Sequence, residues 1–296
     1  MKFTYHLLDV FTEEKFGGNP LAIFPNAHGI PESQFQRIAA ELNLSETVFL
    51  FPEEGDPSCA MRIFTPGMEL PTAGHPTIGT AHFLARQTPA TSQTHKIMLD
   101  QKIGRITVEV QLKNNHPDLI TMYQPLPTFG TTYEHRDAFA RLLSLEAKDL
   151  LDAPIQEVSC GNNFIFIPVR STSALGKIRV RTELWEDLKP SLNTAFLYIF
   201  TTGNVVNGDV QGRMFAPDAG IPEDPATGSA NGPLICYLDK YGLVTAPILS
   251  LQGYEMGRSS QLHLDLAKNA AGEITAVKVG GRCVPIGEGV LFLDTE

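Results

Sequence analysis

The stretch Glu223-Asp224-Pro225-Ala226-Thr227-Gly228-Ser229-Ala230 decides the fold, because the first half of the chain contains a similar one. Pro71-Thr72-Ala73-Gly74-His75-Pro76 has the same proline, glycine and polar residue at the same spacing. Each stretch follows a strand-like segment that ends in proline, residues 62–66 and 213–217, and each leads into a helix-like segment. The two halves therefore share a strand, a glycine turn and a helix start in the same order.

A third pair of similar segments lies upstream of these two. Residues 18–24 and 161–167 both have a Gly-Asn turn before an apolar run. Three pairs in the same order indicate that one unit was duplicated. A duplicated unit predicts a site between the halves, where two glycine turns and two helix starts can face each other.

Length and charge limit the classes of protein that fit this chain. Its 296 residues suggest about two domains. A formal net charge of −10 argues against nucleic acid or an anionic membrane as partner, since phosphate binding needs a basic face. A small anionic substrate fits, because helix N-termini supply local positive potential. With no apolar signal region after Met1 and no membrane-spanning run, the sequence predicts a cytoplasmic protein.

Cysteines and histidines give no sign of a metal or a cofactor. The four cysteines, Cys59, Cys160, Cys236 and Cys283, show no C-x-x-C spacing, and we expect reduced, mostly buried thiols. The eight histidines are scattered without an H-x-x-x-H pair, so we expect no metal site. A P-loop and a dinucleotide fingerprint are also absent from the sequence, and we expect no cofactor.

Apolar spacing predicts the secondary structure. Helical spacing predicts helices at residues 32–42, 75–86 and 229–240, with a further one at 137–145. Short apolar or alternating runs predict strands at residues 3–11, 21–24, 47–51, 61–64, 103–112, 157–169, 194–202, 248–252, 274–279 and 290–294. Helices 75–86 and 229–240 are rich in small residues, and we expect both to be central helices wrapped by sheet.

Two prolines in the segment Pro125–Gly130 interrupt the strand pattern and indicate a linker. The chain is therefore predicted to be an α/β protein of two similar halves, residues 1–124 and 125–284. The final strand, residues 285–296, is expected to pair back onto the first half.

Glu46 is the first candidate for chemistry, because it precedes the apolar run Thr47–Phe51. Desolvation raises the pKa of a carboxyl group toward neutrality, which suits a group that takes and returns a proton. The alternatives are a capping box or an ion pair at the strand edge. The matching stretch of the second half, residues 193–198, holds no carboxylate, which predicts one acid/base group and not a symmetric pair.

His75 and Asp224 are the other catalytic candidates. His75 follows Gly74 at a predicted helix start, where the helix dipole favours a neutral imidazole; the alternative is a histidine that caps its own helix. Asp224 starts an Asp-Pro turn, and the alternative is an N-cap. Leu70 precedes Gly74 by the same four residues as Asp224 precedes Gly228, so a carboxylate has replaced an apolar residue at a repeated position.

The two glycine turns are candidates for binding an anion. After Gly74 and Gly228 the backbone N–H groups of a helix start point outward, and Thr227 and Ser229 add hydroxyl groups. This arrangement suits a substrate carboxylate. The turn at Gly17-Gly18-Asn19-Pro20 is either structural or a contact at the rim of the ligand site.

These motifs together resemble the phenazine-biosynthesis PhzF-like family over essentially the whole chain. The resemblance rests on the Gly-Gly-Asn-Pro turn, Ser45-Glu46-Thr47, residues 69–77 and above all the long string from Glu223 to Ala230. It implies the diaminopimelate-epimerase-like fold, in which each half is a curled, mostly antiparallel sheet around a central helix. It also implies a cofactor-free isomerase that is usually a homodimer.

In the family's best-understood member the substrate is a dihydro-hydroxyanthranilate. The resemblance implies that Glu46 moves a proton along the ring while His75 and Asp224 assist. We expect Asn19, Ser45, Gly74, Thr227, Gly228 and Ser229 to bind the substrate. Related epimerases and racemases carry a cysteine after each glycine turn, and this chain has none there.

The sequence therefore predicts a cofactor-independent isomerase that shifts a proton on a small carboxylated, amino-acid-like or dihydro-hydroxyanthranilate-like substrate. Two alternatives stay open: an epimerase or racemase acting on a related amino acid, and a non-catalytic small-molecule binding protein on the same scaffold.

Overall fold

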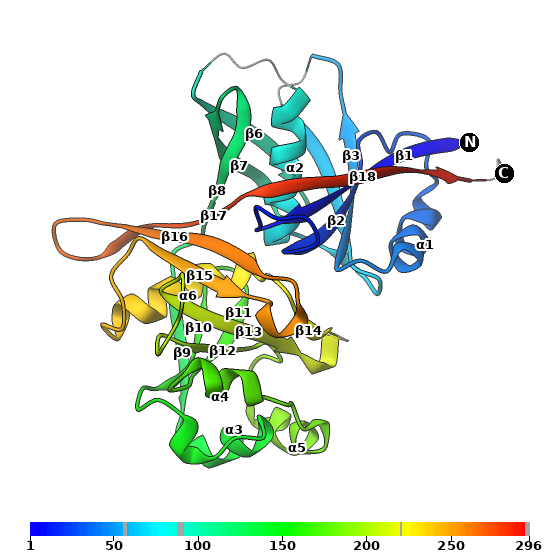
Figure 1. Ribbon diagram of the computed structural model, residues 1–296. Helices are drawn as coiled ribbons and strands as arrows, with labels where there is room; N and C mark the ends of the chain where they lie inside the picture. The colour runs from blue at the N-terminus through cyan, green and yellow to red at the C-terminus, as the bar shows by residue number, and fades with distance from the viewer. Residues whose placement is uncertain (56–57, 88–91, 220, 294–296) are drawn as a thin grey trace. The chain divides into compact units, whose positions relative to one another are not determined.

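The computed structural model describes residues 1–55, 58–87, 92–219 and 221–293. The chain divides into two compact units (Figure 1). Unit 1 comprises Met1–Tyr123 and Gly280–Glu296, and unit 2 comprises Gln124–Val279. Residues 294–296, which the sequence assigns to the final strand, lie outside the described part of the chain.

Unit 1 is a curled sheet around one helix. Its sheet runs in the order β18-β1-β2-β3-β4-β6-β7-β8, with β2–β3 and β4–β6 parallel and the other pairs antiparallel. The elements are β1 (Lys2–Val10), β2 (Asn19–Phe24), α1 (Glu32–Leu42), β3 (Glu46–Pro52), β4 (Ser58–Phe64), β5 (Glu69–Leu70), α2 (Gly74–Gln87), β6 (Thr94–Gln101), β7 (Gly104–Lys113), β8 (His116–Gln124) and β18 (Cys283–Phe292). Leu293 N–H donates to Met1 O at 3.0 Å, which extends the pairing of β18 with β1 to the start of the chain.

Helix α2 is central to unit 1 because it is buried on nearly every side from Gly74 to Phe83. It packs against β1, β2, β3, β6 and β7 (Figure 1). Gly79 shows why small residues are needed: a Cβ there would lie 2.5 Å from Leu21 and 2.9 Å from Val10. The expectation of a central helix wrapped by sheet holds here for the predicted reason.

Unit 2 repeats this plan and adds three outer helices. Its sheet runs β9-β10-β11-β12-β13-β15-β16, with β14 also paired to β13. The elements are β9 (Thr128–Tyr133), α3 (Arg136–Leu142), η1 (Ala147–Asp149), β10 (Ile155–Ser159), β11 (Asn163–Pro168), α4 (Thr172–Lys177), α5 (Thr182–Leu188), η2 (Lys189–Ser191), β12 (Leu197–Thr201), β13 (Val210–Ala216), η3 (Pro217–Ala219), β14 (Ile221–Asp224), α6 (Gly228–Lys240), β15 (Ile248–Gln252), η4 (Tyr254–Met256), β16 (Ser260–Lys268) and β17 (Ile274–Gly281).

The hydrophobic cores follow from these elements. In unit 1, Phe35 of α1 packs with Phe24, Phe49 and Phe64. In unit 2, apolar side chains of α3, α4 and α5 cover the strands, and Trp185 is the largest of them. Figure 1 shows these three helices gathered at one side of unit 2.

Strand register places each residue of one unit against a counterpart, by which we mean the residue at the equivalent position of the other unit. Thr47 pairs with Phe64, and Leu197 pairs with Phe215 in the same way. Thr47 and Leu197 are therefore counterparts. Glu46 directly precedes Thr47 and Phe196 directly precedes Leu197, so Phe196 is the counterpart of Glu46. The duplication proposed from the sequence is visible in the pairing itself, since β2–β3 and β11–β12 are both parallel and β3–β4 and β12–β13 both antiparallel.

The sequence placed most elements but not all. Helix α1 has the predicted bounds, whereas residues 157–169 form two strands, β10 and β11, because Gly161 turns the chain at a φ of +115°. The final strand begins at Cys283 and not at residue 290, since Gly287 and Gly289 interrupt its apolar pattern. Strands β5, β6, β8, β9, β14 and β16 and helices α4 and α5 were not predicted, and β9 begins at Thr128 within the segment predicted as a linker.

Within the described residues, the helices are all too short or too polar to cross a membrane.

Candidate active site

Glu46 and His75 meet in unit 1. Glu46 is the first residue of β3 and pairs in register with Leu21 of β2, while His75 is the second residue of α2. His75 Nε2 lies 3.0 Å from Glu46 Oε2, and the two side chains are 5% and 15% exposed. The packing of α2 against β3 brings them together although 29 positions separate them in the sequence.

His75 is neutral at physiological pH. Burial lowers the pKa of its imidazole from 6.5 to about 3, because a charged ring loses its hydration in the interior. The contact with Glu46 is therefore between a carboxyl group and a neutral ring, which carries one proton on its two nitrogens. The sequence predicted a neutral ring from the helix dipole, and the structure gives burial as the cause.

The other predicted residues of unit 1 come from the same three elements. Asn19 starts β2 and is fully buried, Ser45 directly precedes β3 and is half-buried, and Gly74 starts α2. Helix α2 packs against both β2 and β3. All the site residues predicted for unit 1 therefore lie at or next to the first residues of these three elements.

The predicted residues of unit 2 gather at the start of α6. Asp224 ends β14, and the Thr227 hydroxyl donates to Asp224 Oδ2 at 2.5 Å. Thr227 is the N-cap of α6, so the alternative in which Asp224 caps the helix is wrong. Gly228 and Ser229 are the first two residues of the helix.

Unit 2 also contains polar residues that the sequence did not single out. The fully buried Gln252 makes hydrogen bonds to both ends of the turn from Asp224 to Thr227. Tyr198 and Asn231 continue this network. One sign was available in the sequence: Gln252 ends the apolar strand predicted at residues 248–252.

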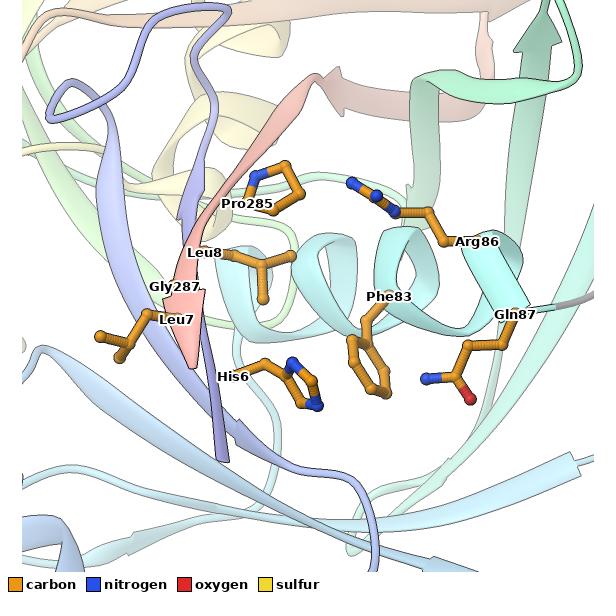
Figure 2. A pocket seen from close by; sticks show the side chains of 8 residues that line it. All are labelled: His6, Leu7, Leu8, Phe83, Arg86, Gln87, Pro285 and Gly287. Carbon is orange, nitrogen blue, oxygen red and sulfur yellow. The ribbon is translucent and has the colours of Figure 1, made fainter. Parts of the chain in front are cut away.

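A pocket of about 260 Å³ lies elsewhere in unit 1 (Figure 2). It is lined by residues of β1, the end of α2 and β18, among them His6, Phe83 and Arg86. Arg86 lies eleven residues after His75 on α2, or about 16 Å along the helix at 1.5 Å per residue. None of the predicted site residues lines this pocket, so it plays no part in the site described above.

The thiols are not arranged as catalytic bases. All four cysteines are buried and reduced, as expected from the sequence. Cys236 Sγ lies 4.0 Å from Cys160 Sγ, and this contact together with burial raises the pKa of the Cys236 thiol. Burial likewise raises the pKa of Cys283. Since the thiolate is the reactive form, these residues do not support a two-thiol mechanism.

The two buried histidines of α2 predict how stability depends on pH. Burial lowers the pKa of His75 to about 3, and burial with the nearby Arg86 charge lowers that of His82 to about 4. Below pH 6.5 the unfolded chain binds protons at these positions and the folded chain does not. The free energy of unfolding should therefore fall as the pH drops from 6.5, with a slope of up to about 1.4 kcal/mol per pH unit for each histidine.

Urea denaturation at pH 7.5, 6 and 5 measures this dependence. His82→Gln should flatten the slope, because it removes one of the two groups. Asp100 provides no competing slope in this window, since Arg105 and Ser58 hold its pKa at about 2. A free energy of unfolding that stays constant between pH 7.5 and 5 would contradict the assignment of neutral, buried rings.

Comparison with known proteins identifies the family. The family model PhzC-PhzF, described as phenazine biosynthesis-like protein, matches residues 8–289. Trans-2,3-dihydro-3-hydroxyanthranilate isomerase from Pseudomonas fluorescens is 34% identical over 293 residues, which cover 98% of this chain and 99% of that protein.

Solved structures agree on the fold. A phenazine biosynthesis protein of the PhzF family from Bacillus anthracis has a TM-score of 0.89 at 24% identity, covering 99% of this chain and 100% of that one. A hydroxyproline epimerase from Agrobacterium vitis has a TM-score of 0.64 at 12% identity, covering 99% and 93%. At these identities they show the fold alone, and they confirm the predicted α/β class with its epimerase-like halves. The chain therefore belongs to the PhzC-PhzF family of phenazine biosynthesis-like proteins, and it is an isomerase.

Proposed function

We propose that this isomerase shifts a proton on a small cyclic amino acid of the dihydro-hydroxyanthranilate type, with Glu46 as the proton-transfer group. The observation that carries the proposal is the 3.0 Å contact between the Glu46 carboxyl group and the buried His75 ring. Register supports a single acid/base group, because the counterpart of Glu46 is Phe196. The similarity to a trans-2,3-dihydro-3-hydroxyanthranilate isomerase supports the substrate class.

The proposed reaction conserves every atom of the substrate. The Glu46 carboxylate removes a proton from one ring carbon, and the electron pair of that C–H bond is delocalised over the diene. The carboxylic acid so formed returns the proton to another carbon of the ring. The same group can act in both steps because it ends each turnover as a carboxylate.

His75 has a supporting role in this proposal. Its neutral ring can donate to the Glu46 carboxylate or accept from the Glu46 carboxylic acid, according to which nitrogen holds its proton. It can therefore contact both protonation states of Glu46 without becoming charged. We propose that Asp224 assists the same reaction from unit 2, where the Thr227 hydroxyl holds its carboxylate.

The direct test is turnover in deuterated water. Trans-2,3-dihydro-3-hydroxyanthranilate is incubated with the protein, and proton NMR follows both the isomer formed and the carbon that exchanges. Isomerisation that depends on Glu46 supports the proposal. Exchange at one carbon with inversion and without a shift of the double bonds would instead favour the epimerase alternative, and an unchanged substrate would reject this substrate class.

Binding of the substrate carboxylate is proposed at the helix starts near Gly74 and Gly228. The Thr227 hydroxyl donates to Asp224 and accepts no hydrogen bond from an amide at the start of α6, so the backbone N–H groups there are the proposed donors. Converting the carboxylate of a competitive ligand to an amide should weaken binding by roughly 1.5–3 kcal/mol, the usual value of hydrogen bonds to a charged group. Isothermal titration with the acid and its amide measures the difference, and equal affinities would exclude this mode of binding.

A further inference from the structure

The side-chain amide of Gln252 makes three hydrogen bonds to the turn that carries Asp224 and one to Tyr198 of β12. Its Nε2 donates to Asp224 O at 2.7 Å and to Thr227 Oγ1 at 2.9 Å. Its Oε1 accepts from Thr227 N at 3.2 Å and from the Tyr198 hydroxyl at 3.2 Å. The residue ends β15 and is fully buried, so these four contacts fix both the position of the turn and the orientation of the amide.

The orientation of this amide sets the direction of the Thr227 hydroxyl. A hydroxyl group has one proton to donate. Because Gln252 Nε2 donates to Thr227 Oγ1, the proton of that hydroxyl is left for Asp224 Oδ2, 2.5 Å away. The amide cannot be reversed, since the backbone N–H of Thr227 can only donate and the carbonyl of Asp224 can only accept.

Tyr198 and Asn231 hold the other side of the amide. Asn231 Nδ2 donates to the Tyr198 oxygen at 3.3 Å and to Thr227 O at 2.9 Å. Burial raises the pKa of Tyr198, so its phenol keeps the proton that it donates to Gln252. A chain of donors therefore runs from Asn231 through Tyr198 to Gln252.

Comparison with unit 1, which has no aspartate at this position, shows which hydrogen bonds are common to both units and which occur only beside Asp224. Gln101 is the counterpart of Gln252. In unit 1 the residue before Gln101, Asp100, pairs with Ala60 of β4. In unit 2 the residue before Gln252, Leu251, pairs in the same way with Gln211 of β13. Gln101 Nε2 donates to Thr77 Oγ1 at 2.7 Å. Its Oε1 has no hydrogen-bond partner among the described residues.

Three of the other network members have apolar counterparts. Unit 1 has Leu70 where unit 2 has Asp224, Ala73 where it has Thr227, and Val48 where it has Tyr198. The counterpart of Asn231 is Thr77, whose hydroxyl donates to Ala73 O at 2.6 Å as Asn231 donates to Thr227 O, so this contact is common to both units. Among the described residues, the hydrogen bonds from the glutamine at the strand end to the turn occur only in the unit that carries the aspartate.

A second contact beside Asp224 is common to both units and so serves the fold. Arg213 binds Glu223 with two hydrogen bonds of 2.8 and 2.7 Å. Arg62 binds Glu69 in the same way, at 2.7 and 3.1 Å. Because this pair occurs in both halves, it does not distinguish the turn that holds Asp224.

We infer that Gln252 is a positioning residue for Asp224. Gln252 orients the Thr227 hydroxyl toward the Asp224 carboxylate and fixes the turn between Asp224 and Thr227. The inference rests on the proposed role of Asp224 in turnover. It assigns to Gln252 an effect on the reaction that is transmitted through Thr227 and not through direct contact with the substrate.

The test compares Gln252→Met with Gln101→Met, in which the same uncharged side chain replaces the counterpart glutamine. With trans-2,3-dihydro-3-hydroxyanthranilate as the probe, Gln252→Met should lower kcat by about 10- to 100-fold, the loss expected from a small displacement of a catalytic group, and change KM much less. Gln101→Met should leave kcat close to the wild-type value. Equal losses in the two variants, or a folded Gln252→Met protein with wild-type kcat, would overturn the inference.

A double-mutant cycle with Thr227→Val tests the route of the effect. If Gln252 acts through the Thr227 hydroxyl, the double variant should be no slower than the slower single variant. Fully multiplicative losses would overturn the inference. Should Gln252→Met fail to fold, Tyr198→Phe replaces it in the cycle, because it removes only the hydroxyl that holds the amide.

A readout without turnover separates this inference from the proposed function. In protein labelled with carbon-13 at the aspartate side-chain carboxyl, the Asp224 resonance should shift in Gln252→Met and stay in place in Gln101→Met. Such a shift in a protein that does not turn over the probe would reject the proposed substrate and keep the positioning role. An unchanged resonance in Gln252→Met would reject the positioning role whatever the activity.

Discussion

Glu46→Gln should lower turnover by at least about 100-fold, the low end for loss of general acid–base catalysis. Glutamine has nearly the same shape, so the packing of β3 against α2 should be kept. It cannot take up a proton from carbon, and its contact with His75 no longer carries a titrating group. Steady-state kinetics with trans-2,3-dihydro-3-hydroxyanthranilate measure the loss, while circular dichroism and competitive binding check that fold and ligand binding are unchanged.

Glu69→Gln is the matched control for this variant. Glu69 is another partly buried glutamate of unit 1, and it binds Arg62 at 2.7 Å. Its replacement alters an ion pair that serves the fold and does not touch His75, so some stability should be lost, while turnover of the folded protein should stay far closer to wild type than in Glu46→Gln. If Glu46→Gln retains turnover near that of Glu69→Gln on a proven substrate, the assignment of Glu46 is wrong.

Gly253→Ala should destabilise the protein by about 2–5 kcal/mol, from a left-handed backbone at about 1–2 kcal/mol and overpacking at about 1–3 kcal/mol. Gly253 has a φ of +77°, and a Cβ there would lie 2.3 Å from Arg258 O and 2.6 Å from Pro225 O. Both neighbours are backbone atoms, which cannot rotate away as a side chain can. The midpoint of urea denaturation measures the effect.

Gly257→Ala separates the two contributions. Gly257 lies at the other end of η4 and has a φ of +69°, but a Cβ there would meet nothing within 4 Å. Its replacement should cost only the left-handed backbone, about 1–2 kcal/mol. Equal losses for the two variants would show that the close approach of residue 253 to the turn at Pro225 does not matter.

The repeated parts of the fold were predictable, because the same turn residues precede the same element in both halves and so mark where that element begins. The glycine turns at Gly74 and Gly228 located α2 and α6 to within one residue at each start. Strand β6 was missed because five of its eight residues are polar and most of its side chains are only partly buried or exposed. The short α4 and α5 cover a core assembled from distant segments, so their own residues carry little periodic signal.

The site was predictable only one residue at a time. Glu46, His75 and Asp224 were each singled out by local context and by resemblance to the family, and their roles are now proposals. The sequence could not show that His75 touches Glu46 and is dehydrated, since that depends on the packing of α2. Gln252 lies 25 residues from Thr227 and 54 from Tyr198, so no local pattern could reveal their network.

The residues that differ between equivalent positions of the two units also bear on how such a chain could arise by duplication and whether it could be split into two fragments. In a symmetric dimer of identical half-length chains, every position must hold the same residue in both copies. Fusion of the two copies into one polypeptide removes that constraint, because each copy then mutates alone. Glu46 against Phe196, and Asp224 against Leu70, are differences that a dimer of identical half-length chains cannot hold. A half-length fragment could therefore recover the full set of residues only when it is expressed together with the other, different fragment.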